Sequence, residues 1–133
     1  MKLKDIFSET FVRLEQLNFN NKSEFSEELN LNFGAHDFIE TVPFEDETIV
    51  YNRYRRVVKT TDDNLVIEVV YGIFSRLKDE IDTNREDIQE IINEDIEDYL
   101  RIIPSEASFS ISSITKCAGL PPLVTKPEFL ESK

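Results

Sequence analysis

Histidine and cysteine, the side chains that most often provide general-base, nucleophilic or metal-binding chemistry near neutral pH, occur once each in this chain of 133 residues. The single histidine, His36, occupies a polar position in an alternating apolar and polar stretch, which indicates the surface of a strand. Cys117 has no spaced partners for a zinc site and no second cysteine for an internal disulfide. The sequence therefore gives no support for a metal site or for histidine-based catalysis.

Paired carboxylates are the other common source of acid–base chemistry, and Glu90 and Glu94 are four residues apart in a predicted helix. They belong to a longer series of acidic positions, so a solvated charged face explains them without catalysis. The chain has only three glycines, and none of the common phosphate-loop, nucleophile-elbow or zinc-protease motifs is present. We therefore predict a protein that is not an enzyme and needs no cofactor.

Composition predicts a single globular domain that spans residues 1–133, because 40% hydrophobic and 32% charged residues can form one core with a soluble surface. With 15 basic and 27 acidic side chains, the net charge of −12 repels phosphate backbones and attracts basic partners. No apolar run approaches the roughly 20 residues that span a bilayer, and the N-terminal segment has no signal-peptide core. We expect no nucleic-acid ligand, no membrane insertion and a cytoplasmic location.

The elements that would position any binding site begin with four predicted strands, over residues 11–19, 28–38, 48–60 and 65–77. Alternation is clearest in the second, where Leu29, Leu31 and Phe33 alternate with polar residues. Pro43 and the acidic residues 45–47 form the connector to the third strand. A polar turn at residues 61–64 joins the last two strands into a long hairpin.

A helical region is predicted after the strands. The capping box Thr83-Asn84-Arg85-Glu86 places its start near residue 83, and an apolar stripe follows at helical spacing. The stripe consists of Ile88, Ile91, Ile92, Ile96, Tyr99, Leu100 and Ile103. Pro104 predicts a kink or break, and a second helix is expected over residues 105–118, ended by Gly119 and two prolines. The tail is expected to be extended and docked by its apolar residues.

Several short motifs stand in a fixed order along nearly the whole chain. They are Leu17-Asn18-Phe19, Leu29-Asn30-Leu31-Asn32, Gly72-Ile73-Phe74-Ser75, Ile103-Pro104, Ala118-Gly119-Leu120-Pro121-Pro122 and Pro127-Glu128-Phe129. In this order they resemble the first two strands, the Gly-Ile-Phe strand ending, the Phe-Pro before the main helix and the closing Gly-Leu-Pro-Pro and Pro-x-x-Phe signature of the SecB family of protein-export chaperones.

The resemblance implies an α+β fold, with a four-stranded antiparallel Greek-key sheet, helices packed on one face, and assembly into dimers and then a dimer of dimers. It also implies a holdase that binds unfolded polypeptides in apolar grooves without ATP, in protein export or for a dedicated client such as a toxin–antitoxin pair. Buried apolar area stabilises such complexes by about 25 cal/mol per Å² whatever the client sequence. A non-catalytic structural or adaptor protein that binds one folded partner is the alternative.

Apolar residues in excess of the strand and helix patterns are the candidates for a client groove. Phe38, Ile39, Val42 and Phe44 crowd around the connector between strands two and three, where a partner-covered surface and an ordinary core explain them equally well. The same two alternatives apply to the apolar residues near the C-terminus. The groove candidates are Phe38, Ile39, Phe44, Leu120 and Leu123.

A second candidate surface follows from the resemblance alone. In the SecB family, acidic residues on the exposed sheet help to dock the translocation ATPase. The matching positions of this chain are Gln16 and Asn20, which are neutral, and Glu68, which matches a third acid with a shift of register. The resemblance therefore identifies Gln16, Asn20 and Glu68 as a docking surface but argues against direct coupling to the translocase.

Overall fold

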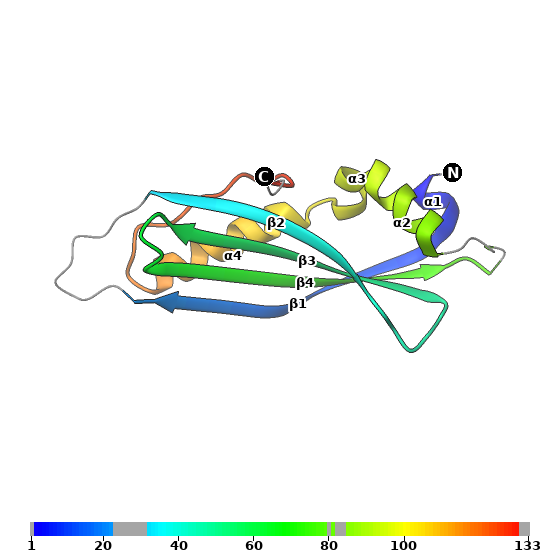
Figure 1. Ribbon diagram of the computed structural model, residues 1–133, viewed down its shortest axis with the longest axis horizontal. Helices are drawn as coiled ribbons and strands as arrows, with labels where there is room; N and C mark the ends of the chain where they lie inside the picture. The colour runs from blue at the N-terminus through cyan, green and yellow to red at the C-terminus, as the bar shows by residue number, and fades with distance from the viewer. Residues whose placement is uncertain (1, 23–31, 80, 82–84, 131–133) are drawn as a thin grey trace.

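The computed structural model describes residues 2–22, 32–79, 81 and 85–130, in which four long strands come before the main helices (Figure 1). The strands are β1 (Phe7–Asn21), β2 (Phe33–Val42), β3 (Ile49–Thr60) and β4 (Leu65–Leu77). The helices are α1 (Leu3–Ile6), α2 (Arg85–Glu94), α3 (Ile96–Leu100) and α4 (Ile103–Cys117).

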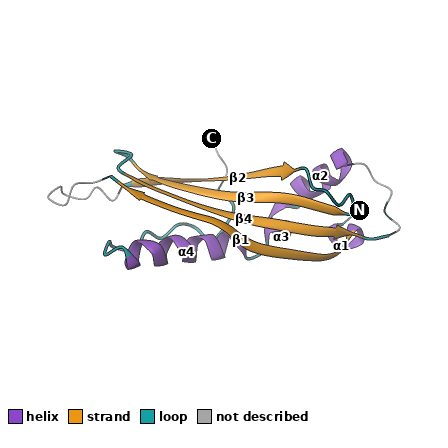
Figure 2. Cartoon of the chain, turned by 90° about the horizontal axis from the view of Figure 1, so that it is seen from below, coloured by secondary structure: helices purple, strands orange, loops and turns teal. Residues whose placement is uncertain are grey.

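The strands form one sheet in the order β1-β4-β3-β2, and every neighbouring pair is antiparallel. Strands β2, β3 and β4 follow one another as hairpins, and β1 lies beside β4, which is Greek-key topology. The helix α4 runs along one face of the sheet (Figure 2). We call that face the helix side and the opposite one the outer face. The predicted fold class is confirmed.

The core lies on the helix side because β3 and β4 alternate along their length. Tyr54, Val58, Ile67 and Ile73 point to the helix side and are at most 1% exposed. The apolar stripe predicted for the helices packs against them, with Ile88, Ile92, Tyr99, Leu100 and Ile103 buried and Ile91 and Ile96 partly buried. The long hairpin occupies the predicted ranges to within one residue.

The predicted continuity of the helical region is wrong. The helix α2 ends at Glu94, α3 covers only Ile96–Leu100, and Arg101 adopts φ 52°, which is outside the helical range. Pro104 lies in the first turn of α4, where a missing N–H breaks no helical hydrogen bond. The break therefore precedes the proline instead of occurring at it. The predicted capping residues Thr83 and Asn84 lie outside the described residues.

Two strand boundaries also differ from the predictions. The strand β1 begins at Phe7, after a short helix α1 that the sequence did not indicate, and β2 extends to Val42. Ile39 and Val42 are therefore strand residues and not part of the connector. Residues 28–31 of the predicted second strand lie outside the described residues.

The C-terminal tail is docked on the helix side, as predicted, and a buried arginine holds it. Arg56 is fully buried and donates hydrogen bonds to both carboxylate oxygens of Asp37 at 2.7 and 2.8 Å. Its remaining N–H groups reach the carbonyl oxygens of Lys126 at 2.7 Å and Glu128 at 2.6 Å. The ring of Phe129 lies 6.4 Å from that of Tyr54. Since each charge has its partner, burial of this ion pair is tolerable.

Candidate functional site

An open groove of about 660 Å³ lies between the first part of β1 and the junction of α3 with α4. We call it the β1–α3 groove; its apolar and charged lining includes Leu3, Phe7, Val12, Tyr99, Arg101 and Ile102. The groove exists because the chain leaves helical geometry at Arg101 and because β1 has a strand neighbour on one side only. It is larger than the openings beside Phe38, Phe44 and Phe129, which measure about 80, 350 and 210 Å³.

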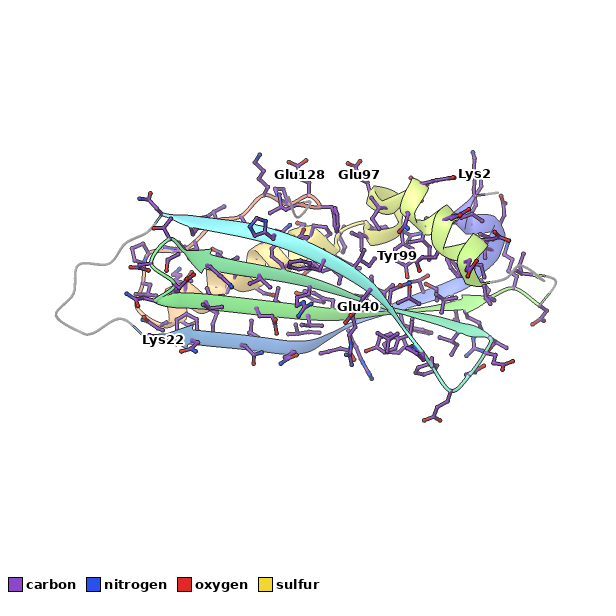
Figure 3. All side chains as sticks on the ribbon, in the orientation of Figure 1. Lys2, Lys22, Glu40, Glu97, Tyr99 and Glu128 are labelled. Atoms are coloured by element: carbon purple, nitrogen blue, oxygen red, sulfur yellow. The ribbon has the colours of Figure 1, made fainter. Side chains whose placement is uncertain are left out.

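The floor of the groove consists of packed aromatic side chains, and its rim is exposed to solvent. The rings of Phe7 and Tyr99 lie 6.3 Å apart, and the Tyr99 hydroxyl accepts a hydrogen bond from Asn52 at 2.9 Å, between the helices and the sheet (Figure 3). Burial raises the pKa of Tyr99, so this hydroxyl stays protonated. On the rim, Ile102 is 67% exposed and Val12 is 46% exposed. The groove therefore combines a buried aromatic floor with exposed apolar side chains on its rim.

Apolar side chains continue along β1 on the helix side. Val12, Leu14 and Leu17, here called the β1 row, stand opposite the buried residues of β4 but are themselves exposed. The helix α4 packs over β4 and leaves this edge of the sheet uncovered. Phe109 of α4 is 71% exposed, so α4 also presents a large apolar side chain to solvent. The β1 row is contiguous on one face of the strand, and a contiguous exposed apolar patch is typical of an interaction surface.

The outer face has an aromatic cluster at one end. Tyr51 stacks on Phe74 with ring centroids 4.3 Å apart, and Phe44 packs edge-on against both rings at 5.8 and 5.6 Å. Phe11, paired with Phe74 across the strands, is 61% exposed. An opening of about 350 Å³ lies beside Phe44 and Tyr51. This second apolar surface is separated from the groove by the sheet.

A bulge in β1 places Glu15 beside this aromatic cluster. Its carboxylate accepts hydrogen bonds from the hydroxyl of Tyr51 and, at 3.1 Å, from Arg13. A Cβ atom at Gly72 would lie 2.5 Å from a carboxylate oxygen of Glu15, so a larger residue at this position would displace the carboxylate. Partial burial opposes ionisation, but the hydrogen bonds from Tyr51 and Arg13 outweigh it and lower the pKa of Glu15. Glu15 is thus a structural carboxylate.

The five groove candidates from the sequence do not come together. Phe38 is exposed on the outer face, and Phe44 belongs to the aromatic cluster. Ile39 and Leu120 are partly buried against the core on the helix side. Leu123 is only 4% exposed, and its backbone N–H donates to the Thr115 hydroxyl at 3.0 Å, so it is a core residue.

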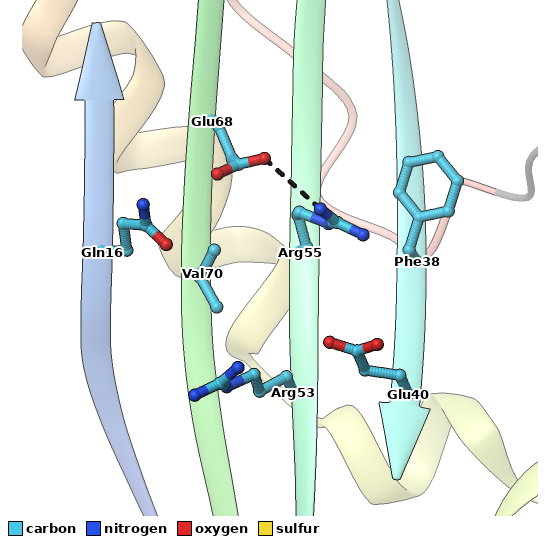
Figure 4. Close-up of a pocket in the computed structure, with 7 residues that line it drawn as sticks. All are labelled: Gln16, Phe38, Glu40, Arg53, Arg55, Glu68 and Val70. Atoms are coloured by element: carbon cyan, nitrogen blue, oxygen red, sulfur yellow. Dashed lines mark ion pairs between the residues drawn. The ribbon is translucent and has the colours of Figure 1, made fainter. Parts of the chain in front are cut away.

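The candidate docking residues do share the outer face. Gln16 and Glu68 line a shallow pocket of about 80 Å³ together with Phe38 (Figure 4), and Asn20 is exposed further along β1. Glu68 is already paired, with Arg55 at 3.5 Å and with the amide of Asn18 at 3.2 Å. The acidic character expected of the family's docking surface is therefore reduced here.

The exposed apolar side chains of the β1–α3 groove, of the β1 row and of Phe109 were not predicted as a site from the sequence. One signal was present in α4: Ala107 and Ile111 define its buried face, so Phe109 falls on the opposite side. For Val12, Leu14 and Leu17 no local signal existed, because the bulge and the absence of a covering helix are properties of the assembled sheet.

Within the part of the chain that the structure describes, no cluster of three His, Cys, Asp or Glu side chains could hold a metal ion. None of the described helices is both long and apolar enough to cross a membrane.

A Greek-key sheet with helices on one face, closed by a docked tail, defines this chain as a protein with the SecB-like fold. Among solved structures it is similar to the SecB-like chaperone Rv1957 of Mycobacterium tuberculosis in complex with a ChAD peptide from the HigA1 antitoxin Rv1956. The TM-score is 0.65 at 10% identity, over 88% of this chain and 83% of that one. The resemblance inferred from the motifs is confirmed at the level of the fold.

A protein of unknown function from Streptococcus agalactiae is also similar, with a TM-score of 0.49 and 9% identity over 89% of this chain and 97% of that chain. No family model matches the sequence, and no curated protein sequence matches it.

Proposed function

We propose that this protein is an ATP-independent holdase that binds unfolded or non-native polypeptides in the β1–α3 groove. The observation that carries the proposal is the groove itself, an open cavity of about 660 Å³ with an apolar floor and the exposed rim residues Val12 and Ile102. The fold supports it, because a SecB-like chaperone of the same fold binds a peptide from an antitoxin. The client is a polypeptide of export or of a dedicated system such as a toxin–antitoxin pair.

Apolar contact suits a holdase because it is tolerant of sequence. Full burial of one large aliphatic or aromatic side chain contributes about 1.5–3 kcal/mol, and no particular client residue is needed. Lys4, Asp98 and Arg101 on the groove walls add charges of both signs, so acidic and basic client segments find partners there. The net charge of −12 keeps a loaded complex soluble and favours basic clients in a cytoplasmic setting.

The protein acts as a homo-oligomer in this proposal, first as a dimer and then as a dimer of dimers. An edge strand with an exposed apolar row is a template for pairing with another chain, and β1 has that character. Leu14, Leu17 and Phe109 would be covered by a second copy, while the β1–α3 groove, with Val12 on its rim, stays open for the client. A mass of about four chains in solution, each of 15.5 kDa, is the expected result.

The alternative is an adaptor that binds one folded partner, and the aromatic cluster on the outer face is the observation that favours it. Aromatic side chains are enriched at the interfaces between folded proteins. Client selectivity separates the two functions: an adaptor binds one folded protein and ignores unfolded chains, whereas a holdase binds many unfolded chains.

The test is suppression of aggregation of a chemically reduced, unfolded protein, followed by light scattering at stoichiometric amounts and without nucleotide. The wild type is expected to protect, and Ile102→Ser is expected to protect poorly because it removes the most exposed apolar side chain of the groove. Val124→Ser is the matched control, since Val124 is 70% exposed and does not line the groove. A wild-type protein that neither protects nor binds the unfolded client would refute the holdase.

A further inference from the structure

The described part of the C-terminal tail runs back to β2 and lies on the buried pair of Arg56 and Asp37 as a bound peptide would (Figure 1). Arg56 donates hydrogen bonds to the carbonyl oxygens of Lys126 and Glu128, at 2.7 and 2.6 Å. A carboxylate oxygen of Asp37 accepts the N–H of Leu130 at 2.8 Å, and the N–H of Asp37 donates to the Leu130 carbonyl at 2.7 Å. We call Arg56 and Asp37 the clamp.

The clamp contacts mainly the backbone of the tail. The hydrogen bonds just described join it to peptide groups of every second residue, a spacing that an extended chain provides. The nearby Ser108 hydroxyl also donates to a backbone group, the carbonyl oxygen of Thr125, at 2.7 Å. Among the described tail residues, only Thr125 accepts a hydrogen bond from Arg56 through its side chain, at 2.8 Å. Since peptide groups are common to all sequences, such a site suits extended segments of different sequence.

The side chains of the tail are buried on one side and exposed on the other. Thr125 is 5% exposed, whereas Val124 before it is 70% exposed. Residues 126–128 are exposed as well, and Phe129 and Leu130 are partly buried. The last part of the tail is therefore held by backbone hydrogen bonds and by two apolar side chains, which are contacts that another extended segment could make.

The tail does not fill the space that it covers. A cavity of about 210 Å³ lies beside Pro127 and Phe129, against Leu100 of α3 and Pro104 of α4. Burial of apolar area stabilises a complex by about 25 cal/mol per Å². A segment with a bulkier apolar side chain in the place of Pro127 would therefore bind more tightly than the tail itself.

We propose that the clamp is a second client-binding site, which the tail occupies as an internal ligand and which an extended apolar segment of the client enters by displacing residues 126–130. This proposal rests on the proposed holdase function, because its ligand is the client. A tethered tail competes at an effective concentration on the order of millimolar. Weak ligands are therefore excluded, and segments that also fill the cavity beside Pro127 are admitted.

The test measures binding of a fluorescein-labelled peptide with the sequence of residues 123–130 to the full-length protein by fluorescence anisotropy. Phe129→Ala/Leu130→Ala in the protein weakens the internal ligand and leaves the clamp unchanged, so the peptide is expected to bind this variant about tenfold more tightly than the wild type. Val124→Ala/Lys126→Ala is the matched control, because it truncates two exposed side chains of the same tail. It is expected to leave the peptide affinity unchanged.

The peptide itself tests the cavity and the location of the site. A peptide with Pro127→Leu is expected to bind more tightly than the unchanged peptide. A photo-crosslinking side chain in place of Phe129 is expected to attach to the part of β3 that contains Tyr54, since the two rings lie 6.4 Å apart. Crosslinking is done on the wild-type chain at high peptide concentration, so it remains decisive if the double variant does not fold.

Three results would overturn the proposal. They are equal peptide affinity in the wild type and Phe129→Ala/Leu130→Ala, an equal gain in the matched control, and attachment of the photo-crosslinking group to β1. Loss of peptide binding in Ile102→Ser would have the same meaning as attachment to β1, because Ile102 lines the β1–α3 groove and does not line the cavity beside Pro127.

Failure of the holdase gives a different result from failure of the clamp. A wild type that binds the peptide at the clamp but does not suppress aggregation refutes the holdase and keeps the clamp as a peptide site. A wild type that suppresses aggregation in a manner dependent on Ile102, while the peptide fails to bind any of the variants, refutes the clamp alone.

Discussion

Strand β3 has arginines on both of its faces, and the two faces use the same side chain in opposite ways. Arg56 points to the helix side and is fully buried. Its N–H groups donate hydrogen bonds to Asp37 and to backbone carbonyl oxygens of the tail. Arg53 and Arg55 point to the outer face, remain 45% and 43% exposed, and stack on aromatic rings. On the helix side the arginine stabilises the fold, whereas on the outer face the arginines remain accessible to solvent.

The comparison extends to the acids that accompany the arginines. Asp37 accepts from Arg56 and from the hydroxyl of Tyr54 at 2.7 Å, within the core. Burial and the charge of Asp37 raise the pKa of Tyr54, so its hydroxyl remains a donor. Glu68, on the outer face, is 3.5 Å from Arg55 and partly solvated. A buried ion pair fixes geometry, while an exposed one contributes little to stability and remains open to exchange with a partner.

The largest effect is expected from Arg56→Met. It leaves Asp37 buried without its counter-ion and releases the carbonyls of the tail, so unfolding free energy should fall by about 3–5 kcal/mol. Urea unfolding followed by circular dichroism measures it. The same substitution on the outer face, Arg55→Met, should cost less than about 1 kcal/mol. Similar losses of unfolding free energy in Arg56→Met and Arg55→Met would contradict the different roles given to the arginines of the two faces.

A second contrast within α4 sharpens the comparison, since Ile111 faces the sheet and Phe109 faces solvent. Ile111→Ala should lower the free energy of unfolding by about 2–5 kcal/mol because it opens a cavity in the core. Phe109→Ala should change it by less than about 0.5 kcal/mol. Sedimentation velocity is expected to show weakened self-association for Phe109→Ala. A stability loss as large as that of Ile111→Ala would show that Phe109 is buried in the free chain.

Gly72→Ala tests the structural role of the Glu15 carboxylate on the outer face. The new Cβ would displace the Glu15 carboxylate from Tyr51 and Arg13, at an expected cost of about 1 kcal/mol in unfolding free energy. In the double variant Glu15→Ala/Gly72→Ala the two losses should not add, because both remove the same contacts. Additive losses would mean that Gly72 has another role.

The smallest expected effect is a pH dependence from Glu15. Its pKa is lower in the folded chain than the ordinary value of 4.5, so its contribution to stability is complete above that value and is lost as the pH falls through the folded pKa. Thermal unfolding midpoints between neutral pH and acid should therefore fall less steeply for Glu15→Gln than for the wild type. Parallel curves would contradict the role given to the carboxylate.

The sequence predicted the β3–β4 hairpin almost to the residue, because alternation and the Asp-Asp-Asn turn are local features. The sequence correctly predicted which helical side chains are buried, but it did not predict that the helical region is interrupted at Asp95 and Arg101. An apolar stripe indicates which side of a helix is buried and not whether the backbone is continuous. Neither Asp95 nor Arg101 is a helix-breaking residue type. Asp37 and Arg56 each interrupt an apolar row, which was a readable sign of their buried pair.

The candidate site was harder to predict than the fold. Phe38 is adjacent in sequence to Ile39, but the pleat of β2 places the two side chains on opposite faces. The β1–α3 groove joins residues that are far apart in the sequence, Leu3 and Ile102 among them. Such a site is created by tertiary packing, and no local pattern encodes it.

The place of β1 in the sheet has a consequence for how the chain is made. Asn18 meets Glu68, 50 positions later, and Thr10 meets Ser75, 65 positions later, whereas Thr41 and Asn52 are only 11 apart. During synthesis β1 leaves the ribosome first and must wait for β4 before it can pair. Until then its apolar row is exposed on an unpaired strand. The nascent chain of this protein would itself be a substrate for the kind of protection proposed for the finished one.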